Sequence, residues 1–212
     1  MHTHTEESQR SLTPADALEF LKEGNVRFCA NLKANRNLLQ QVNETQDGQW
    51  PFAAILSCID SRTSAELIFD QGLGDIFSIR IAGNVLNDDI LGSLEFACAA
   101  AGARLIVVLG HSRCGAIQGA CDGVEMGFLT GLLKKIAPSI EAVSERGEVE
   151  RGNAKDGDFV QAVARENVRT VVSGIVGRSG VLQDLKANGR VEVVGALYDV
   201  VSGSVDFLPA DS

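Results

Sequence analysis

The feature that most constrains the fold of this chain is a series of four apolar runs of strand length, at 52–57, 76–82, 105–109 and 191–197. The runs consist mostly of β-branched residues or Leu, and they do not alternate with polar positions. Continuous apolar runs of this kind are typical of strands that helices cover on both faces. Because helical patterns separate the runs, we expect an α/β fold with a mainly parallel central sheet flanked by helices. Residues 198–208 are expected to add an edge strand.

The helical patterns also define the organisation of the chain. Helices are expected at 65–69, 90–101, 114–122, 128–143, 159–172 and 181–187. An earlier helix begins at Thr13-Pro14, with Thr as the N-cap and Pro at the first helical position, and forms an N-terminal helical arm over 13–34. Residues 1–12 are expected to form a mobile polar tail, and 35–49 a polar loop. Since no internal repeat or linker interrupts the pattern, residues 1–212 are expected to form a single domain.

Composition excludes several classes of partner. The chain has 28 acidic and 19 basic residues and a formal net charge of -9, without the basic footprint of a nucleic-acid binder. No apolar run approaches the roughly 18 to 20 residues that cross a bilayer, so no membrane partner is expected. The N-terminus does not resemble a signal peptide, and a cytoplasmic location is therefore expected. In that reducing compartment the five cysteines would be free thiols or metal ligands.

Metal-ligand residue types follow two of the predicted strands. Cys58, Asp60 and Arg62 share one face of an extended chain, while His111 and Cys114 lie three residues apart across a strand-to-helix turn. Cys58, His111 and Cys114 together suit Zn²⁺ and leave a fourth position open, as in catalytic sites whose zinc-bound water becomes a hydroxide nucleophile. Asp60 could accept a hydrogen bond from that hydroxide or ligate zinc and close the site, and Arg62 could hold the carboxylate away. From the residues alone, two buried thiols and a structural histidine remain an open alternative.

The pattern Cys-x-Asp-x-Arg, followed further along the chain by His-x-x-Cys, resembles the β-class carbonic anhydrases. The likeness extends to 69–72, 80–84 and 195–199. It implies one zinc ion per subunit on Cys58, His111 and Cys114, with Asp60 and Arg62 as a catalytic dyad. The implied reaction is the reversible hydration of carbon dioxide to bicarbonate and a proton. The resemblance further implies an N-terminal arm packed on a partner subunit, in a homodimer or homotetramer.

The same resemblance implies substrate-binding roles for Gln49, Phe77 and Phe96. Gln49 would enter the active site of a neighbouring subunit, and the two phenylalanines would form an apolar wall. Two alternatives remain open: a hydrolase of carbonyl sulfide or carbon disulfide on the same scaffold, and a non-catalytic zinc-binding protein closed by Asp60. The other three cysteines occupy apolar faces of predicted helices and are expected to be buried as small hydrophobic residues; they are Cys29, Cys98 and Cys121.

Overall fold

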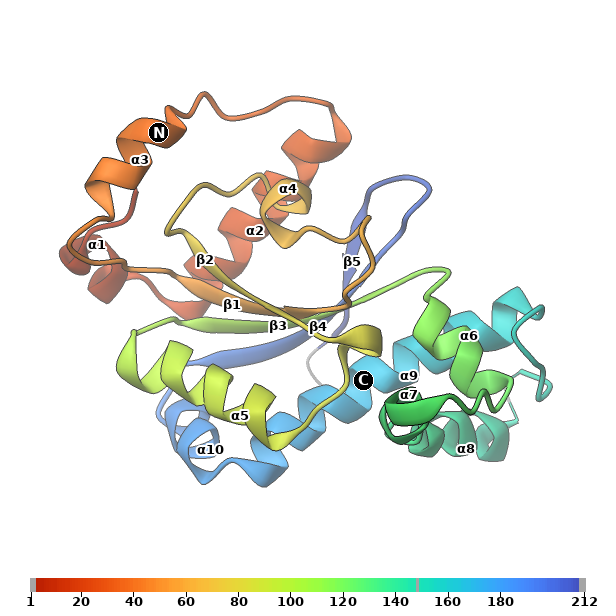
Figure 1. The fold of residues 1–212 in the computed structure, drawn as a ribbon. Helices are drawn as coiled ribbons and strands as arrows, with labels where there is room; N and C mark the ends of the chain where they lie inside the picture. The colour runs from red at the N-terminus through yellow and green to blue at the C-terminus, as the bar shows by residue number, and fades with distance from the viewer. Residues whose placement is uncertain (1–2, 148, 210–212) are drawn as a thin grey trace.

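The described residues, 3–147 and 149–209 of a computed structural model, form a five-stranded sheet with helices on both faces (Figure 1). The strand order is β2-β1-β3-β4-β5, with β1–β4 parallel and β5 antiparallel to β4. The strands are β1 (Ala53–Ser57), β2 (Ile76–Arg80), β3 (Leu105–His111), β4 (Glu192–Tyr198) and β5 (Val205–Phe207). The predicted α/β class, the mainly parallel sheet and the C-terminal edge strand are therefore confirmed.

Helices connect the strands and form layers above and below the sheet in Figure 1. The α-helices are α1 (Glu6–Ser11), α2 (Pro14–Cys29), α3 (Leu38–Glu44), α4 (Ala65–Ile68), α5 (Asp88–Glu95), α6 (Gly115–Cys121), α7 (Gly127–Leu133), α8 (Ala137–Arg146), α9 (Gly157–Arg178) and α10 (Gly180–Ala187). A 3₁₀ turn, η1 (Ala82–Asn84), follows β2, and a π-helical turn, η2 (Phe96–Ala100), extends α5. No helix within the described ranges has the length and apolar character needed to cross a membrane.

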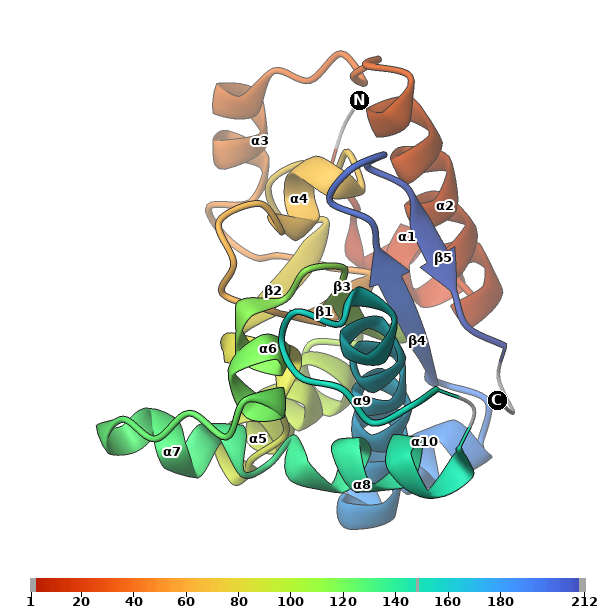
Figure 2. The same ribbon diagram turned by 90° about the vertical axis from the view of Figure 1, so that its right-hand side faces the viewer.

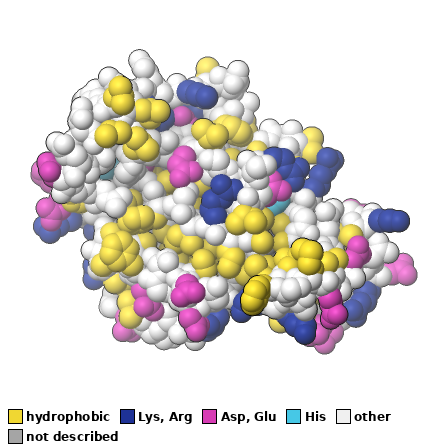
Figure 3. Space-filling view, in the orientation of Figure 1, with side chains coloured by type: hydrophobic (Ala, Val, Ile, Leu, Met, Phe, Trp, Pro, Cys, Tyr) yellow, Lys and Arg dark blue, Asp and Glu magenta, His cyan; other side chains and the backbone are white. Residues whose placement is uncertain are grey.

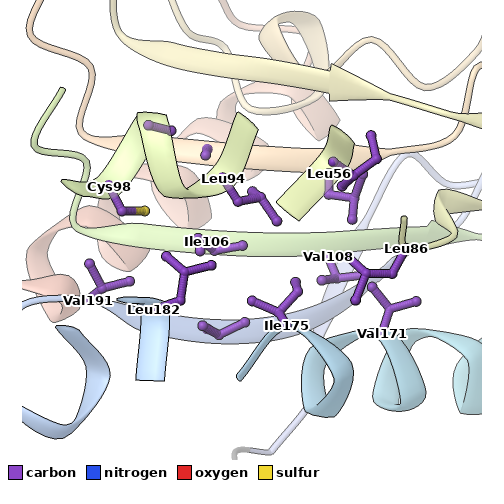
Figure 4. Packing of buried hydrophobic residues seen from close by; sticks show 14 of the residues in the cluster. Leu56, Leu86, Leu94, Cys98, Ile106, Val108, Val171, Ile175, Leu182 and Val191 are labelled. Carbon is purple, nitrogen blue, oxygen red and sulfur yellow. The ribbon is translucent and has the colours of Figure 1, made fainter. Parts of the chain in front are cut away.

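Successive residues of the central strands pack into different cores, because neighbouring side chains on a strand point to opposite faces. Leu56 and Ile106 pack against α5, α9 and α10 on one face, as the close-up in Figure 4 shows. Ile55 and Leu105 pack on the other face, in a cluster with Leu21 of α2 and side chains of α4. The sheet is therefore buried on both sides, which explains the continuous apolar runs.

A third apolar cluster lies beside the carboxyl ends of the parallel strands. It contains Cys58 and Cys114 together with buried side chains of α6, α8 and α9. Figures 1 and 2 show α6, α7 and α8 gathered at this end of the sheet. Ligands of open α/β sheets bind at the carboxyl ends of the strands, so a functional site is expected at this end of the sheet.

The N-terminal segment differs from the sequence-based expectation. Residues 6–11 form α1, and the buried side chain of Gln9 donates hydrogen bonds to the carbonyls of Pro51 at 2.6 Å and Ala101 at 2.8 Å. The expectation of a mobile tail over 1–12 is therefore wrong for the described part of that segment, and Met1 and His2 lie outside the described residues. The helical arm predicted for 13–34 ends at Cys29, where α2 ends.

Two other predicted segments also differ. The segment expected as a polar loop at 35–49 contains α3, which the side chain of Asn37 caps by accepting a hydrogen bond from Gln40. The single helix expected at 128–143 is divided into α7 and α8. Pro138 would disrupt the interior of one long helix, but proline is tolerated in the first turn. A second helix, α8, therefore starts just before Pro138.

Candidate active site and metal centre

The pairing of β1 with β3 brings three ligand-type side chains together. Ser57 lies opposite Leu109, so Cys58 and His111 emerge from neighbouring strands at the same edge of the sheet. Cys114 lies three residues beyond His111, at the N-cap of α6. The two Sγ atoms are 3.9 Å apart, and the potential ligand atoms of the three buried residues all lie within 4.8 Å of one another. The structure thus assembles the predicted Cys2His group.

The hydrogen bonds of His111 fit a metal ligand. Nδ1–H donates a hydrogen bond to the carbonyl oxygen of Ser112 at 2.9 Å, a tautomer that leaves the lone pair on Nε2. Nε2 is buried without a hydrogen-bond partner among the described residues, an arrangement that costs free energy unless a further group is bound there. Two thiolates and one neutral imidazole suit zinc, and bonds of about 2.3 Å in a tetrahedron separate two sulfurs by about 3.8 Å. The observed Sγ–Sγ distance is close to that separation.

The two thiols also influence each other. A hydrogen bond from Cys114 lowers the pKa of Cys58, and main-chain hydrogen bonds from Asp60 and Gly83 lower it further. The pKa of Cys114 is raised by the same hydrogen bond and by burial. The first proton of the pair is therefore released more readily than the second.

Asp60 and Arg62 form a bidentate ion pair at the rim of the group. Nε of Arg62 donates to Oδ1 at 2.9 Å and Nη2 donates to Oδ2 at 2.7 Å, while the Arg62 main-chain N–H also donates to Oδ1. The guanidinium holds the pKa of the Asp60 carboxyl well below its usual range. Both carboxylate oxygens are thereby engaged, and Asp60 does not belong to the close group of potential ligand atoms found among the described residues. A metal ion held by the three ligands would therefore keep a fourth coordination position in this arrangement of Asp60.

Two side chains that the sequence analysis did not single out hold the turn between Cys58 and Asp60. Arg80, at the end of β2, donates to the carbonyl of Cys58 at 3.0 Å and to that of Asp60 at 2.6 Å. The buried hydroxyl of Thr63 donates to the same two carbonyls. A cation at the end of an apolar strand is the signal that could have identified Arg80, because such a side chain can reach the neighbouring strand end.

A small, mainly apolar pocket of about 380 Å³ opens beside Cys58 and Asp60. Its walls come from the turn after β1, from η1 and from the α6–α7 region, and several of its residues have small side chains. The lining residues are Cys58, Ile59, Asp60, Ala82, Gly115, Ala116, Gly119, Val124, Leu129 and Leu133. Such a pocket suits a small uncharged molecule.

The three predicted substrate-binding residues do not line this pocket. Phe77 and Phe96 pack edge to face with ring centroids 6.2 Å apart, and they line a separate open groove of about 610 Å³ between β2 and α5. Gln49 is an exposed residue in the segment before β1. Among the described residues of one chain, these three therefore do not join the pocket beside Cys58, and their substrate-binding roles stay predictions.

The remaining cysteines differ from one another in burial. Cys98 is buried, which raises its thiol pKa to about 12. Cys121 is half-buried, and burial raises its pKa to about 11. Cys29 is exposed, so its predicted burial is wrong: it is the last residue of α2, beyond the buried Asn25.

A buried Cys2His group with an open position, beside an Asp–Arg pair at the carboxyl edge of a mainly parallel sheet, defines a class of candidate metalloenzymes. Comparison with known proteins narrows this class. The model of the carbonic anhydrase family matches residues 53–205. The chain is 36% identical over 198 residues to carbonic anhydrase 2 of Mycobacterium tuberculosis, covering 90% of each protein. It is 33% identical over 200 residues to a carbonic anhydrase of Mycolicibacterium smegmatis, covering 91% of this chain and 92% of that one.

Solved structures agree with the sequence matches. The β-carbonic anhydrase CafA of Aspergillus fumigatus superimposes with a TM-score of 0.73 at 26% identity, covering 93% of this chain and 91% of that one. A structure from Sordaria macrospora, described among two tetrameric β-carbonic anhydrases, gives a TM-score of 0.71 at 25% identity, covering 78% of this chain and 84% of that one. The chain belongs to the β-class carbonic anhydrase family, as the sequence resemblance implied.

Proposed function

We propose that this protein binds one zinc ion per subunit on Cys58, His111 and Cys114 and catalyses the reversible hydration of carbon dioxide to bicarbonate and a proton. The observation that carries the proposal is the buried Nε2 of His111, which has no hydrogen-bond partner among the described residues and belongs to a close group with two thiols. Zinc bound with an open position lowers the pKa of water towards neutrality and so supplies a nucleophile at physiological pH.

The residues of the chain then position the reactants. The Asp60 carboxylate, fixed and ionised by Arg62, can accept a hydrogen bond from the nucleophile and orient its lone pair. The apolar pocket receives linear, uncharged carbon dioxide. The amide of Gln49 from a neighbouring subunit would donate a hydrogen bond to a bicarbonate oxygen.

The proton released in the reaction must leave the site. Of the two histidines that the structure describes, His111 belongs to the metal group and His4 packs against the rings of Phe20 and Phe52. Proton transfer to buffer is therefore expected, and the turnover rate should rise with buffer concentration. A rate that stays flat while proton transfer limits turnover would contradict this route.

Stopped-flow hydration of carbon dioxide by metal-quantified protein tests the proposal. We expect Cys58→Ser to lose zinc, because one of the two thiolates is removed, and Asp60→Asn to retain zinc while losing rate. Cys98→Ser is the control, since Cys98 is buried away from the group in a different apolar cluster. Full zinc content and full activity in Cys58→Ser would show that the ligand assignment is wrong.

The same samples separate the alternative functions. Hydrogen sulfide release from carbonyl sulfide or carbon disulfide, without carbon dioxide hydration, would assign a hydrolase on this scaffold. Stoichiometric zinc with no hydration at any pH would indicate a non-catalytic site closed by Asp60. The Asp60–Arg62 ion pair favours the open form, because it engages both oxygens of the carboxylate.

We also propose that the chain forms homodimers or homotetramers through the open side of β2. This strand lies at the edge of the sheet, and the groove beside it exposes Phe96, whose relative exposure is 60%. Apolar side chains form a band across this view of the surface (Figure 3). Light scattering after size exclusion should show an assembly that Phe96→Asp dissociates, while Val201→Asp, at an exposed position of the β4–β5 connection, leaves it intact. An unchanged mass for Phe96→Asp would rule out this interface.

A further inference from the structure

Asn167 is a buried amide on an otherwise apolar face of α9. Its relative exposure is 1%, and Val163 and Val171, one turn away on either side, are also buried. Burying an amide costs free energy unless the group is hydrogen-bonded. The Nδ2 atom of Asn167 donates to the carbonyl oxygen of Gly83 at 2.9 Å. The amide therefore links the long helix to the turn after β2.

Gly83 in turn contacts a residue of the metal group. Its main-chain N–H donates to Sγ of Cys58, with an N–S distance of 3.3 Å. The residue adopts a left-handed conformation, with φ 66° and ψ 18°, which orients this N–H towards the sulfur while the carbonyl faces α9. Two hydrogen bonds thus connect the Asn167 side chain to the sulfur of Cys58 through one residue.

We infer that Asn167 is a positioning residue for Cys58, acting on the metal ligand through the main chain of Gly83. This inference rests on the proposed zinc site. A hydrogen bond to a thiolate withdraws negative charge from the sulfur, and outer partners of this kind orient metal ligands and tune the metal. The Gly83 carbonyl and N–H lie in neighbouring peptide planes joined at the Gly83 Cα. Without the amide, the plane that carries the carbonyl loses a restraint, and the left-handed conformation that directs the N–H towards the sulfur is held less firmly.

The test is metal binding by Asn167→Leu, which keeps the approximate size of the side chain and removes the donor. Competition with a chromogenic chelator should show a zinc dissociation constant about 10- to 100-fold higher than that of the unsubstituted protein. Cobalt-loaded protein supplies a second readout, since the sulfur-to-cobalt charge-transfer band should shift when the N–H···S hydrogen bond is lost. Asn167→Gln keeps a donor and should move both readouts back towards those of the unsubstituted protein.

Val171→Ala is the matched control. It weakens packing on the same helix without touching Gly83, so it should lower unfolding stability while leaving zinc affinity and the cobalt band unchanged. If Asn167→Leu does not fold in the metal-free form, Asn167→Ala carries the same test without adding bulk. A folded variant without the donor that binds zinc within twofold of the unsubstituted protein, with an unchanged band, would overturn the inference. Failure of the unsubstituted protein itself to bind zinc would instead overturn the proposed function.

Discussion

The backbone at Gly83 permits a quantitative test of how closely the metal group is enclosed. A Cβ atom added there would lie 3.0 Å from Cδ1 of Ile136 and 3.2 Å from Cβ of Ala116. Gly189, after α10, has the same φ of 66° but no heavy atom within 4 Å of such a Cβ. Gly83→Ala and Gly189→Ala therefore carry the same free-energy cost for the left-handed backbone. Gly83→Ala adds a cost for steric contact with its neighbours.

The expected magnitudes follow from these two costs. A left-handed conformation costs an L-residue about 1–2 kcal/mol, so Gly189→Ala should lower the free energy of unfolding by about that amount. Overpacking adds about 1–3 kcal/mol, so Gly83→Ala should cost about 2–5 kcal/mol in total. The gain from a less flexible unfolded chain, about 0.4–1 kcal/mol, reduces both of these losses equally and so cancels in their difference.

Urea unfolding of the metal-free proteins, followed by circular dichroism in reducing buffer, measures this difference. Zinc affinity should separate the variants as well, because a displaced Gly83 moves its N–H away from Cys58. Gly189 precedes β4, at the end of the sheet opposite to His111. Equal losses of unfolding free energy in the two variants would refute the idea that Ile136 and Ala116 enclose this turn.

Three further outcomes are expected. Leu94→Ala should lower the unfolding free energy by about 2–5 kcal/mol in urea titrations, because the side chain is fully buried between α5 and the sheet, and a loss below 1 kcal/mol would contradict that packing. Hydrogen bonds, led by that from the Ser202 hydroxyl, lower the pKa of Asp199 to about 2, so its ionised form stabilises the fold above its unfolded pKa of about 3.9 and this contribution is lost as the pH falls towards 2. The stability difference between Asp199→Asn and the unsubstituted protein should therefore shrink on acidification, whereas a difference independent of pH would argue against those hydrogen bonds. Brief alkylation of the metal-loaded protein followed by mass spectrometry should label exposed Cys29 and spare Cys98, whose pKa is about 12; rapid labelling of Cys98 would show that its cluster opens.

The sheet was predictable from sequence because burial on both faces leaves an uninterrupted apolar signature. All five residues of β1 are buried, as are all seven of β3, so neither strand alternates between apolar and polar positions. The Cys2His group was predictable in turn, because ligand-type residues follow these two strands. Parallel pairing places the two strand ends at one edge.

The short helices α1 and α3 were not predictable in the same way. Their sequences are largely polar. Hydrogen bonds from Gln9 to Pro51 and Ala101 hold α1 in place, and contacts between residues so far apart in the sequence cannot be predicted from a local pattern. Asn167 did carry a signal, a lone amide on the apolar face of a predicted helix, but its partner Gly83 could be identified only in three dimensions. Phe77 and Phe96 line a groove separate from the pocket beside Cys58, so their predicted substrate-binding roles stay predictions.

The wide separation in sequence between Cys58 and His111 has a consequence for folding. Their side chains meet only after β1 and β3 have paired, so the cation site is a product of tertiary structure. Because the unfolded chain does not hold this site, the free energy of metal binding would add to the stability of the fold. The unfolding temperature would then rise with the concentration of free metal.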